Sequence, residues 1–191
     1  LVDAGTIGSR LFLDEQRRIR VVLLTHLHFD HIRELPTLAD NLVGEIDEPV
    51  VIAAIPEVLD GLRAHIFNGT VYPDFFRLPD PARPVFVPYE LRAGREDLLC
   101  GMGVTPIRVN HVVPTVGFLL REGAHRVLYS GDTYQTDALW QVAKEVSGLR
   151  AGIYQDGEAG VAGIRLPSQA AVSRPDPAGA RATGYSSFDR A

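Results

Sequence analysis

The chain of 191 residues contains 46% hydrophobic and 23% charged residues, a composition typical of a single globular domain with its own core. Its formal net charge of −5 and the lack of a Lys/Arg run argue against a surface that binds nucleic acid. The chain contains no apolar stretch of about eighteen residues, which a membrane span would need, and no signal-peptide pattern opens it. The single Cys100 excludes an internal disulfide, which slightly favours the cytoplasm.

The first segments predict strands that alternate with helices. Residues Leu1 to Gly5 have the pattern of the end of a strand whose beginning is absent, so we expect the chain to be a fragment. A short run of branched apolar residues from Arg20 to Thr25 predicts a buried strand. The apolar spacing from Ile32 to Leu42 predicts a helix with Pro36 in its first turns.

A second strand and helix precede a segment rich in proline. Val50 to Ile55 predicts a strand, and Pro56 opens a predicted helix that extends to Ile66. Prolines punctuate residues 68–100, so we expect loops there.

The next segments predict three strands and a helix. The strand-like runs are Val104 to Asn110, Val116 to Arg121 and Arg126 to Ser130. Residues 122–125, with the sequence Glu-Gly-Ala-His, predict a hairpin turn that makes the last two strands antiparallel neighbours. A helix from Thr133 to about Val146 completes an α/β pattern with antiparallel parts.

The composition changes after Arg150. The segment 151–191 is rich in Gly, Ala and Pro, and its large apolar residues follow no period. Such a segment buries too little apolar surface to offset its ordering entropy, so we expect a mobile tail. We therefore divide the chain into one domain, residues 1–150, and a divergent tail, residues 151–191.

A cluster of metal-ligand side chains follows the first buried strand. Three histidines and a carboxylate lie within six positions, as His26, His28, Asp30 and His31. In an extended segment His26 and His28 project to the same side, while the adjacent Asp30 and His31 diverge and can serve a second ion. Crowded imidazole and carboxylate groups are costly without a cation between them, so the cluster predicts a metal site.

Two further residues occupy strand ends later in the chain. His111 follows a predicted strand, from which it could reach a cleft at the sheet edge, and by itself it could equally be a structural histidine. Asp132 follows another strand, with Gly131 permitting a tight turn. By itself, Asp132 would be explained as the N-cap of the next helix.

Together these residues resemble the ordered signature of the metallo-β-lactamase fold superfamily. Its members carry an early Asp, an H-x-H-x-D-H motif, a later His and a later Asp, which correspond to Asp3, His26 to His31, His111 and Asp132. The resemblance extends from Leu1 to about Leu149. It implies a metallo-β-lactamase-like αββα sandwich of the α/β class, which we expect to be incomplete at both ends.

Other segments resemble the class II 3′,5′-cyclic-nucleotide phosphodiesterases. They are His65-Ile66-Phe67-Asn68, Val71-Tyr72-Pro73-Asp74-Phe75, residues 109–118, and Ser130-Gly131-Asp132-Thr133 with Leu139-Trp140. None of these segments has a general explanation as a metal site. His65 could contact substrate or be merely structural.

The resemblance implies a centre with two Zn²⁺ ions. His26, His28 and His111 would bind the first ion, Asp30 and His31 the second, and Asp132 would bridge them, with Asp30 and Asp132 also catalytic. By this resemblance, two such ions would supply a hydroxide nucleophile, and attack on phosphorus would open the ring of a small-molecule cyclic nucleotide, cAMP or cGMP. The product would be a nucleoside 5′-monophosphate.

The chain also departs from the superfamily pattern. A further histidine usually completes the second metal site, and no histidine follows His125 here. Either the tail is truncated or frame-shifted, or Asp156 or Glu158 substitutes. Alternative functions are therefore another hydrolase of this fold, such as a glyoxalase II-like thioesterase or a lactonase, and an inactive metal-binding remnant. The acidic charge disfavours a nuclease.

Overall fold

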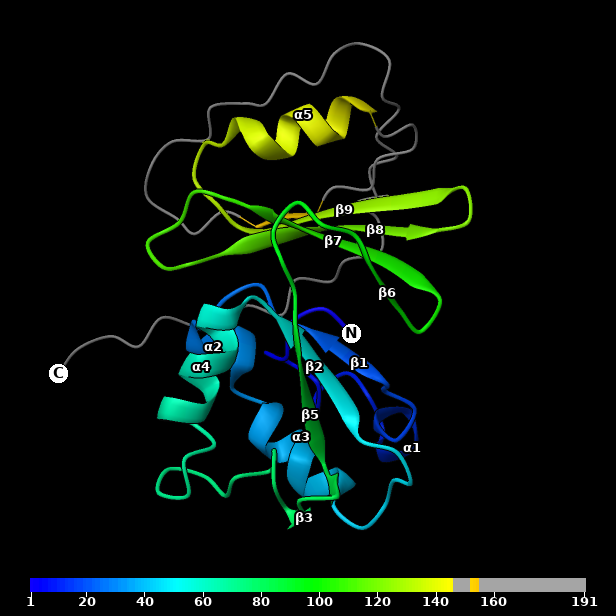
Figure 1. Ribbon diagram of the computed structural model, residues 1–191, viewed down its shortest axis with the longest axis vertical. Coiled ribbons are helices and arrows are strands. Elements are labelled where there is room, and N and C mark those ends of the chain that lie inside the picture. Colours follow the sequence, from blue (N-terminus) through cyan, green and yellow to red (C-terminus); the bar gives the residue numbers. More distant parts are fainter. Residues whose placement is uncertain (146–151, 155–191) are drawn as a thin grey trace, which may run out of the picture.

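The computed structural model describes residues 1–145 and 152–154, whose strands form two main sheets that face each other (Figure 1). The smaller sheet is parallel and has the order β1-β2-β5, with strands Val21–Leu23, Val50–Ala54 and Phe86–Glu90. Its strands are short and mostly apolar, as expected for a sheet covered on both faces.

The larger sheet has the order β10-β9-β8-β7-β6. These strands are β6 (Asp97–Leu99), β7 (Met102–Arg108), β8 (Val116–Glu122), β9 (His125–Asp132) and β10 (Gly152–Tyr154). Strands β6 to β9 are antiparallel, and β10 runs parallel to β9. The predicted hairpin is confirmed: Glu122 pairs with His125 across a tight turn in which Gly123 has a φ of 56°.

Helices cover the outer faces of the two sheets, which gives the predicted αββα sandwich (Figure 1). On the side of the smaller sheet lie α1 (Leu13–Gln16), α2 (Phe29–Ile32), α3 (Leu35–Leu42) and α4 (Pro56–His65). Helix α5 (Asp137–Glu145) covers the larger sheet. A proline lies within the first two positions of each of two helices, Pro36 in α3 and Pro56 in α4. The missing N–H costs nothing there because it would have no partner within the helix.

The main core lies between the sheets and under the helices of the smaller sheet. Ile52 and Phe86 from the smaller sheet and Val104, Val116 and Phe118 from the larger one belong to one buried cluster. A second, smaller cluster of Ile107, Leu128 and Leu139 fixes α5 on the opposite face of the larger sheet. The packing thus holds the ends of β1, β7 and β9 in fixed relative positions.

The structure corrects two predictions of local structure. Strands β5 and β6 lie in the segment 68–100, for which we expected loops, and Pro88 is tolerated because β5 is an edge strand in the described sheet. A two-stranded hairpin of β3 (Pro79–Asp80) and β4 (Arg83–Pro84) precedes it. Helix α5 begins at Asp137 instead of Thr133, so Asp132 ends a strand and is not an N-cap.

The expectation of a mobile tail falls almost entirely outside the described residues. The exception is Gly152–Tyr154, which forms β10 with Tyr154 in register with Asp132. Among the described residues, none of the helices has the length and apolar character that a membrane span requires.

Candidate metal centre

The predicted ligands converge at one edge of the sandwich. His26 and His28 follow β1, and His31 lies in α2, which begins immediately after His28. His111 follows β7, and Asp132 ends β9. The strands therefore bring together side chains that are more than one hundred positions apart in the sequence.

Four of these side chains form a compact group that could hold one ion. His26, His28, His111 and Asp132 each offer a ligand atom, and the four atoms lie within 4.8 Å of one another. His111 Nε2 lies 3.1 Å from His28 Nδ1, and His26 Nε2 lies 3.9 Å from Asp132 Oδ2. His26 is fully buried and Asp132 is 3% exposed. Imidazole and carboxylate groups in this arrangement suit Zn²⁺ or a similar divalent ion.

The hydrogen bonds of His26 leave one nitrogen directed at this group. Thr25 Oγ1 lies 3.0 Å from both carboxylate oxygens of Asp3 and 2.8 Å from His26 Nδ1. A carboxylate only accepts, so the single hydroxyl proton goes to Asp3, and His26 Nδ1–H must donate to Thr25. His26 Nε2 then carries a lone pair.

The surroundings of His26 Nε2 show whether these residues fit a metal ion. His26 Nε2 is buried and has no hydrogen-bond partner in the structure. Burial, together with the neighbouring His31, His28 and His111, lowers the pKa of His26 to about 3, so the ring stays neutral at physiological pH. A buried polar atom without a partner is costly, and a cation would satisfy it. The residues present therefore fit a bound metal.

A second group of polar side chains surrounds His31. Its Nε2 lies 3.5 Å from Asp30 Oδ2 and 3.4 Å from Asp132 Oδ2, while its Nδ1 lies 2.8 Å from Asp3 Oδ2. Burial lowers the pKa of His31, but the hydrogen bond and charge of Asp3, with Asp132 and Asp30, raise it overall. Asp132 thus borders both groups, while Asp30, with a side chain that is 60% exposed, faces solvent.

Asp3 orients both groups, a role that the sequence signature did not reveal. Its carboxylate accepts hydrogen bonds from the Thr25 backbone N–H and hydroxyl, from His31 Nδ1 and from the Tyr129 hydroxyl, the last at 3.4 Å. Burial, with the charge and hydrogen bond of Asp3, raises the pKa of Tyr129, so that hydroxyl remains a donor. Such partners fix the tautomer and direction of metal-binding histidines.

Some of the sequence candidates lie elsewhere. His65 is exposed at the last position of α4 and is not one of the four side chains that form the compact group. Phe67 packs in an aromatic group with Tyr72, Phe75, Phe76 and Phe86, which gives its segment a structural role. Asp156 and Glu158 lie outside the described residues.

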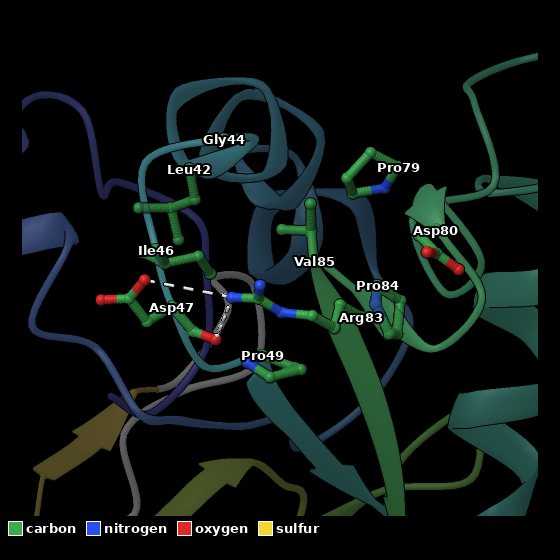
Figure 2. A pocket seen from close by; sticks show the side chains of 10 residues that line it. All are labelled: Leu42, Gly44, Ile46, Asp47, Pro49, Pro79, Asp80, Arg83, Pro84 and Val85. Atoms are coloured by element: carbon green, nitrogen blue, oxygen red, sulfur yellow. Dashed lines mark hydrogen bonds and ion pairs between the residues drawn. The ribbon is translucent and has the colours of Figure 1, made fainter.

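A different pocket lies at the opposite end of the smaller sheet. Its volume is about 390 Å³, and its lining includes Pro49 and Val85, which precede β2 and β5. Figure 2 shows the Arg83 side chain reaching toward Asp47, whose backbone oxygen accepts a 2.9 Å hydrogen bond from Arg83. The arginine of this pocket is therefore already paired, and no histidine lines it.

A family comparison agrees with the geometry. The model of the beta-lactamase superfamily domain matches residues 1–159. The chain belongs to this superfamily. The predicted superfamily membership and fold are confirmed, and the match extends nine residues past the domain boundary that we placed at residue 150.

Individual relatives within the superfamily match parts of the chain. Ribonuclease Z from Metallosphaera sedula is 31% identical over 105 residues, which are 54% of this chain and 31% of that protein. Unliganded yeast PDE1 superposes on 63% of this chain and 36% of its own, with 21% identity and a TM-score of 0.56. The metallo-beta-lactamase fold protein YhfI from Bacillus subtilis has a TM-score of 0.53 and 21% identity, over 71% of this chain and 52% of its own.

These comparisons define the function at a coarse level. The chain spans about a third of the length of ribonuclease Z and of yeast PDE1. The structural likenesses show the fold. Superfamily membership and the His/Asp cluster together support a hydrolase that depends on a divalent metal.

Proposed function

We propose that this protein is a Zn²⁺-dependent phosphodiesterase that hydrolyses 3′,5′-cyclic nucleotides to nucleoside 5′-monophosphates. The observation that carries the metal centre is the buried, unpartnered His26 Nε2, which lies in a group of four potential ligands. The choice of substrate is supported by the segments that resemble class II cyclic-nucleotide phosphodiesterases. The likeness to yeast PDE1 is compatible with that choice.

The side chains divide into two ligand sets in this proposal. His26, His28 and His111 would hold one ion, Asp30 and His31 would hold the other, and Asp132, which borders both groups, would contribute to both. Two Zn²⁺ ions supply positive charge to the phosphoryl oxygens and lower the pKa of a water nucleophile. Asp3 and Thr25 keep the imidazoles of His31 and His26 in the orientation that ligation needs.

The reaction requires one water and one proton transfer. The water oxygen forms a bond to phosphorus, the bond from phosphorus to O3′ breaks, and O3′ receives a proton. The exposed carboxyl of Asp30 lies at the solvent side of the centre and can carry that proton. The product is the ring-opened 5′-monophosphate.

A second candidate is hydrolysis of RNA, because the matched relative that is 31% identical is a ribonuclease. Both candidates break a phosphorus–oxygen bond, so the same centre serves either substrate. The formal net charge of −5 favours the small cyclic nucleotide over a polyanion.

Substrate comparison tests the proposal. The full chain with Zn²⁺ is assayed on cyclic AMP, cyclic GMP, a structured RNA with a 3′ extension, a glutathione thioester and a lactone, with His28→Ala as the inactive control. Turnover of a cyclic nucleotide that His28→Ala abolishes supports the proposal. Turnover of RNA, thioester or lactone without that of a cyclic nucleotide contradicts it.

Metal stoichiometry separates the enzyme from an inactive remnant. After exhaustive dialysis, two Zn²⁺ per chain with turnover support the two-ion centre. One Zn²⁺ per chain without turnover would indicate a remnant that keeps only the site of His26, His28 and His111.

A further inference from the structure

An exposed aromatic ring lies beside the candidate centre. The Tyr134 ring centroid is 5.8 Å from that of His111, and the two ring planes are inclined by 38°. Tyr134 is 59% exposed, and among the described residues His111 is its aromatic neighbour. The tyrosine ring therefore lies beside His111, while much of its surface faces solvent.

The backbone around Tyr134 is attached to the loop that carries His111. The Tyr134 N–H donates to the Asn110 carbonyl oxygen at 2.7 Å, and the Thr133 hydroxyl lies 3.2 Å from the same oxygen and 2.7 Å from the Tyr134 carbonyl oxygen. Asn110 Nδ2 donates in return to the Gln135 carbonyl at 3.4 Å. These bonds hold the turn after β9 against the loop after β7. The ring is thus positioned before any ligand arrives, which lowers the entropic cost of stacking on it.

Two other exposed apolar side chains adjoin the ligands in the sequence. Phe29 follows His28, Val112 follows His111, and each is 68% exposed. Exposed large apolar side chains that gather near a polar centre are typical of a surface that contacts a ligand.

We propose that Tyr134 is the stacking face for the planar base of a nucleotide whose phosphate lies at the His/Asp centre. The inference rests on the proposed function and adds the residue that recognises the base. In a nucleotide the ribose separates the base from the phosphate, so a base-stacking ring belongs beside the centre and not within it. Stacking is tolerant of base identity because every base has an aromatic face.

Binding of reaction products tests the proposal without requiring turnover. Isothermal titration calorimetry measures the affinity of the Zn²⁺-loaded full chain for adenosine 5′-monophosphate and for ribose 5-phosphate, which lacks the base. The variants are Tyr134→Ala, Tyr134→Phe and the control Phe12→Ala, which removes an exposed aromatic side chain next to α1, away from α2 and α4 in Figure 1. Zinc content is measured for each variant.

The expected pattern is specific to stacking. The wild type and Phe12→Ala bind adenosine monophosphate about tenfold or more tightly than ribose 5-phosphate, and Tyr134→Phe keeps this preference. Tyr134→Ala loses the preference while its zinc content stays at the wild-type level. Equal affinities of the wild type for the two ligands, or a preference that survives Tyr134→Ala, would overturn the proposal.

Two outcomes separate this inference from the proposed function. Loss of zinc in Tyr134→Ala, with both ligands weakened equally, would show that Tyr134 only supports His111 and would overturn the stacking role. A preference that depends on Tyr134, in a protein that hydrolyses no cyclic nucleotide, would support the base site while refuting the proposed reaction. If the wild type hydrolyses a cyclic nucleotide but Tyr134→Ala keeps the preference for adenosine monophosphate, the proposed reaction is supported and the base site is refuted.

Discussion

The two ends of the β1-β2-β5 sheet place ionisable side chains in opposite environments. At the carboxyl end, His26 is fully buried and Asp132 is 3% exposed, and His26 Nε2 has no hydrogen-bond partner. At the amino end, Asp47 is fully exposed and pairs with Arg83 beside the pocket of Figure 2. Both ends are polar, but the buried polar side chains, such as His26 and Asp132, lie at the carboxyl end.

This difference indicates at which end of the sheet the fold loses stability in order to keep a functional site. Buried polar groups lower the stability of the folded chain unless a partner compensates them, whereas exposed ion pairs cost and contribute little. In α/β sheets, ligands also tend to bind outside the carboxyl ends of the strands. We therefore expect substitutions at the carboxyl end to change metal binding and catalysis, and substitutions at the amino end to change neither.

The largest effect is expected for His28→Ala. Removal of this imidazole takes one ligand from the group of His26, His28, His111 and Asp132. Loss of the charge stabilisation that a metal provides should lower kcat/KM for cyclic AMP about a thousandfold or more. His65→Ala, at the exposed end of α4, is the matched histidine control and should retain wild-type kinetics. A loss of kcat/KM of similar size in His65→Ala would contradict the expectation that His28 matters for catalysis and His65 does not.

Asp3→Asn should have the next largest effect. The substitution keeps the shape of the side chain but removes the charge that faces His31 Nδ1 at 2.8 Å and the acceptor pair that fixes Thr25 Oγ1. Affinity for Zn²⁺ should fall about tenfold to a hundredfold, as measured by competition with a chelating dye. Asp47→Asn at the amino end is the control. Unchanged zinc affinity in Asp3→Asn would mean that Asp3 does not orient the imidazoles.

Gly61→Ala tests whether α4 supports the histidine loop. A Cβ atom at Gly61 would lie 2.1 Å from Leu27 Cδ1, and Leu27 separates His26 from His28. We expect the overpacking to lower the free energy of unfolding by about 1–3 kcal/mol and to weaken zinc binding several-fold.

The double variant Gly61→Ala/Leu27→Ala makes this test specific. Leu27→Ala removes the atom that the new methyl group contacts, so adding Gly61→Ala to it should have little further effect in urea denaturation and zinc titration. Additive losses would show that the glycine acts elsewhere than on Leu27.

The candidate ligands at the carboxyl end could be recognised in the sequence because their signals are local. His26, His28, Asp30 and His31 form a short motif after an apolar run, and His111 and Asp132 each follow a segment with the pattern of a strand. Strand ends in a packed sheet meet at common edges, so such residues are expected to converge. The structure brings them together.

The support of these ligands could not be predicted because it depends on distant contacts. Asp3 bonds to Thr25 across 22 positions and to Tyr129 across 126, and no pattern in the chain joins these residues. Strand β5 was missed for a related reason: its pairing with β2 overrides the proline that argues locally against a strand. Likewise, the ring of Tyr134 lies beside His111 because hydrogen bonds join the two turns that carry these residues.

The smallest effect is expected for Arg83→Ala at the amino end. Arg83 donates to the Asp47 backbone oxygen at 2.9 Å and lies 3.9 Å from its carboxylate, but both side chains are well exposed, so water replaces either interaction readily. We expect Tm to change by about two degrees or less and zinc content, kcat and KM to stay at wild-type values. A loss of activity here, without a loss of zinc, would assign a functional role to the pocket of Figure 2 and would remove the contrast between the two ends of the sheet.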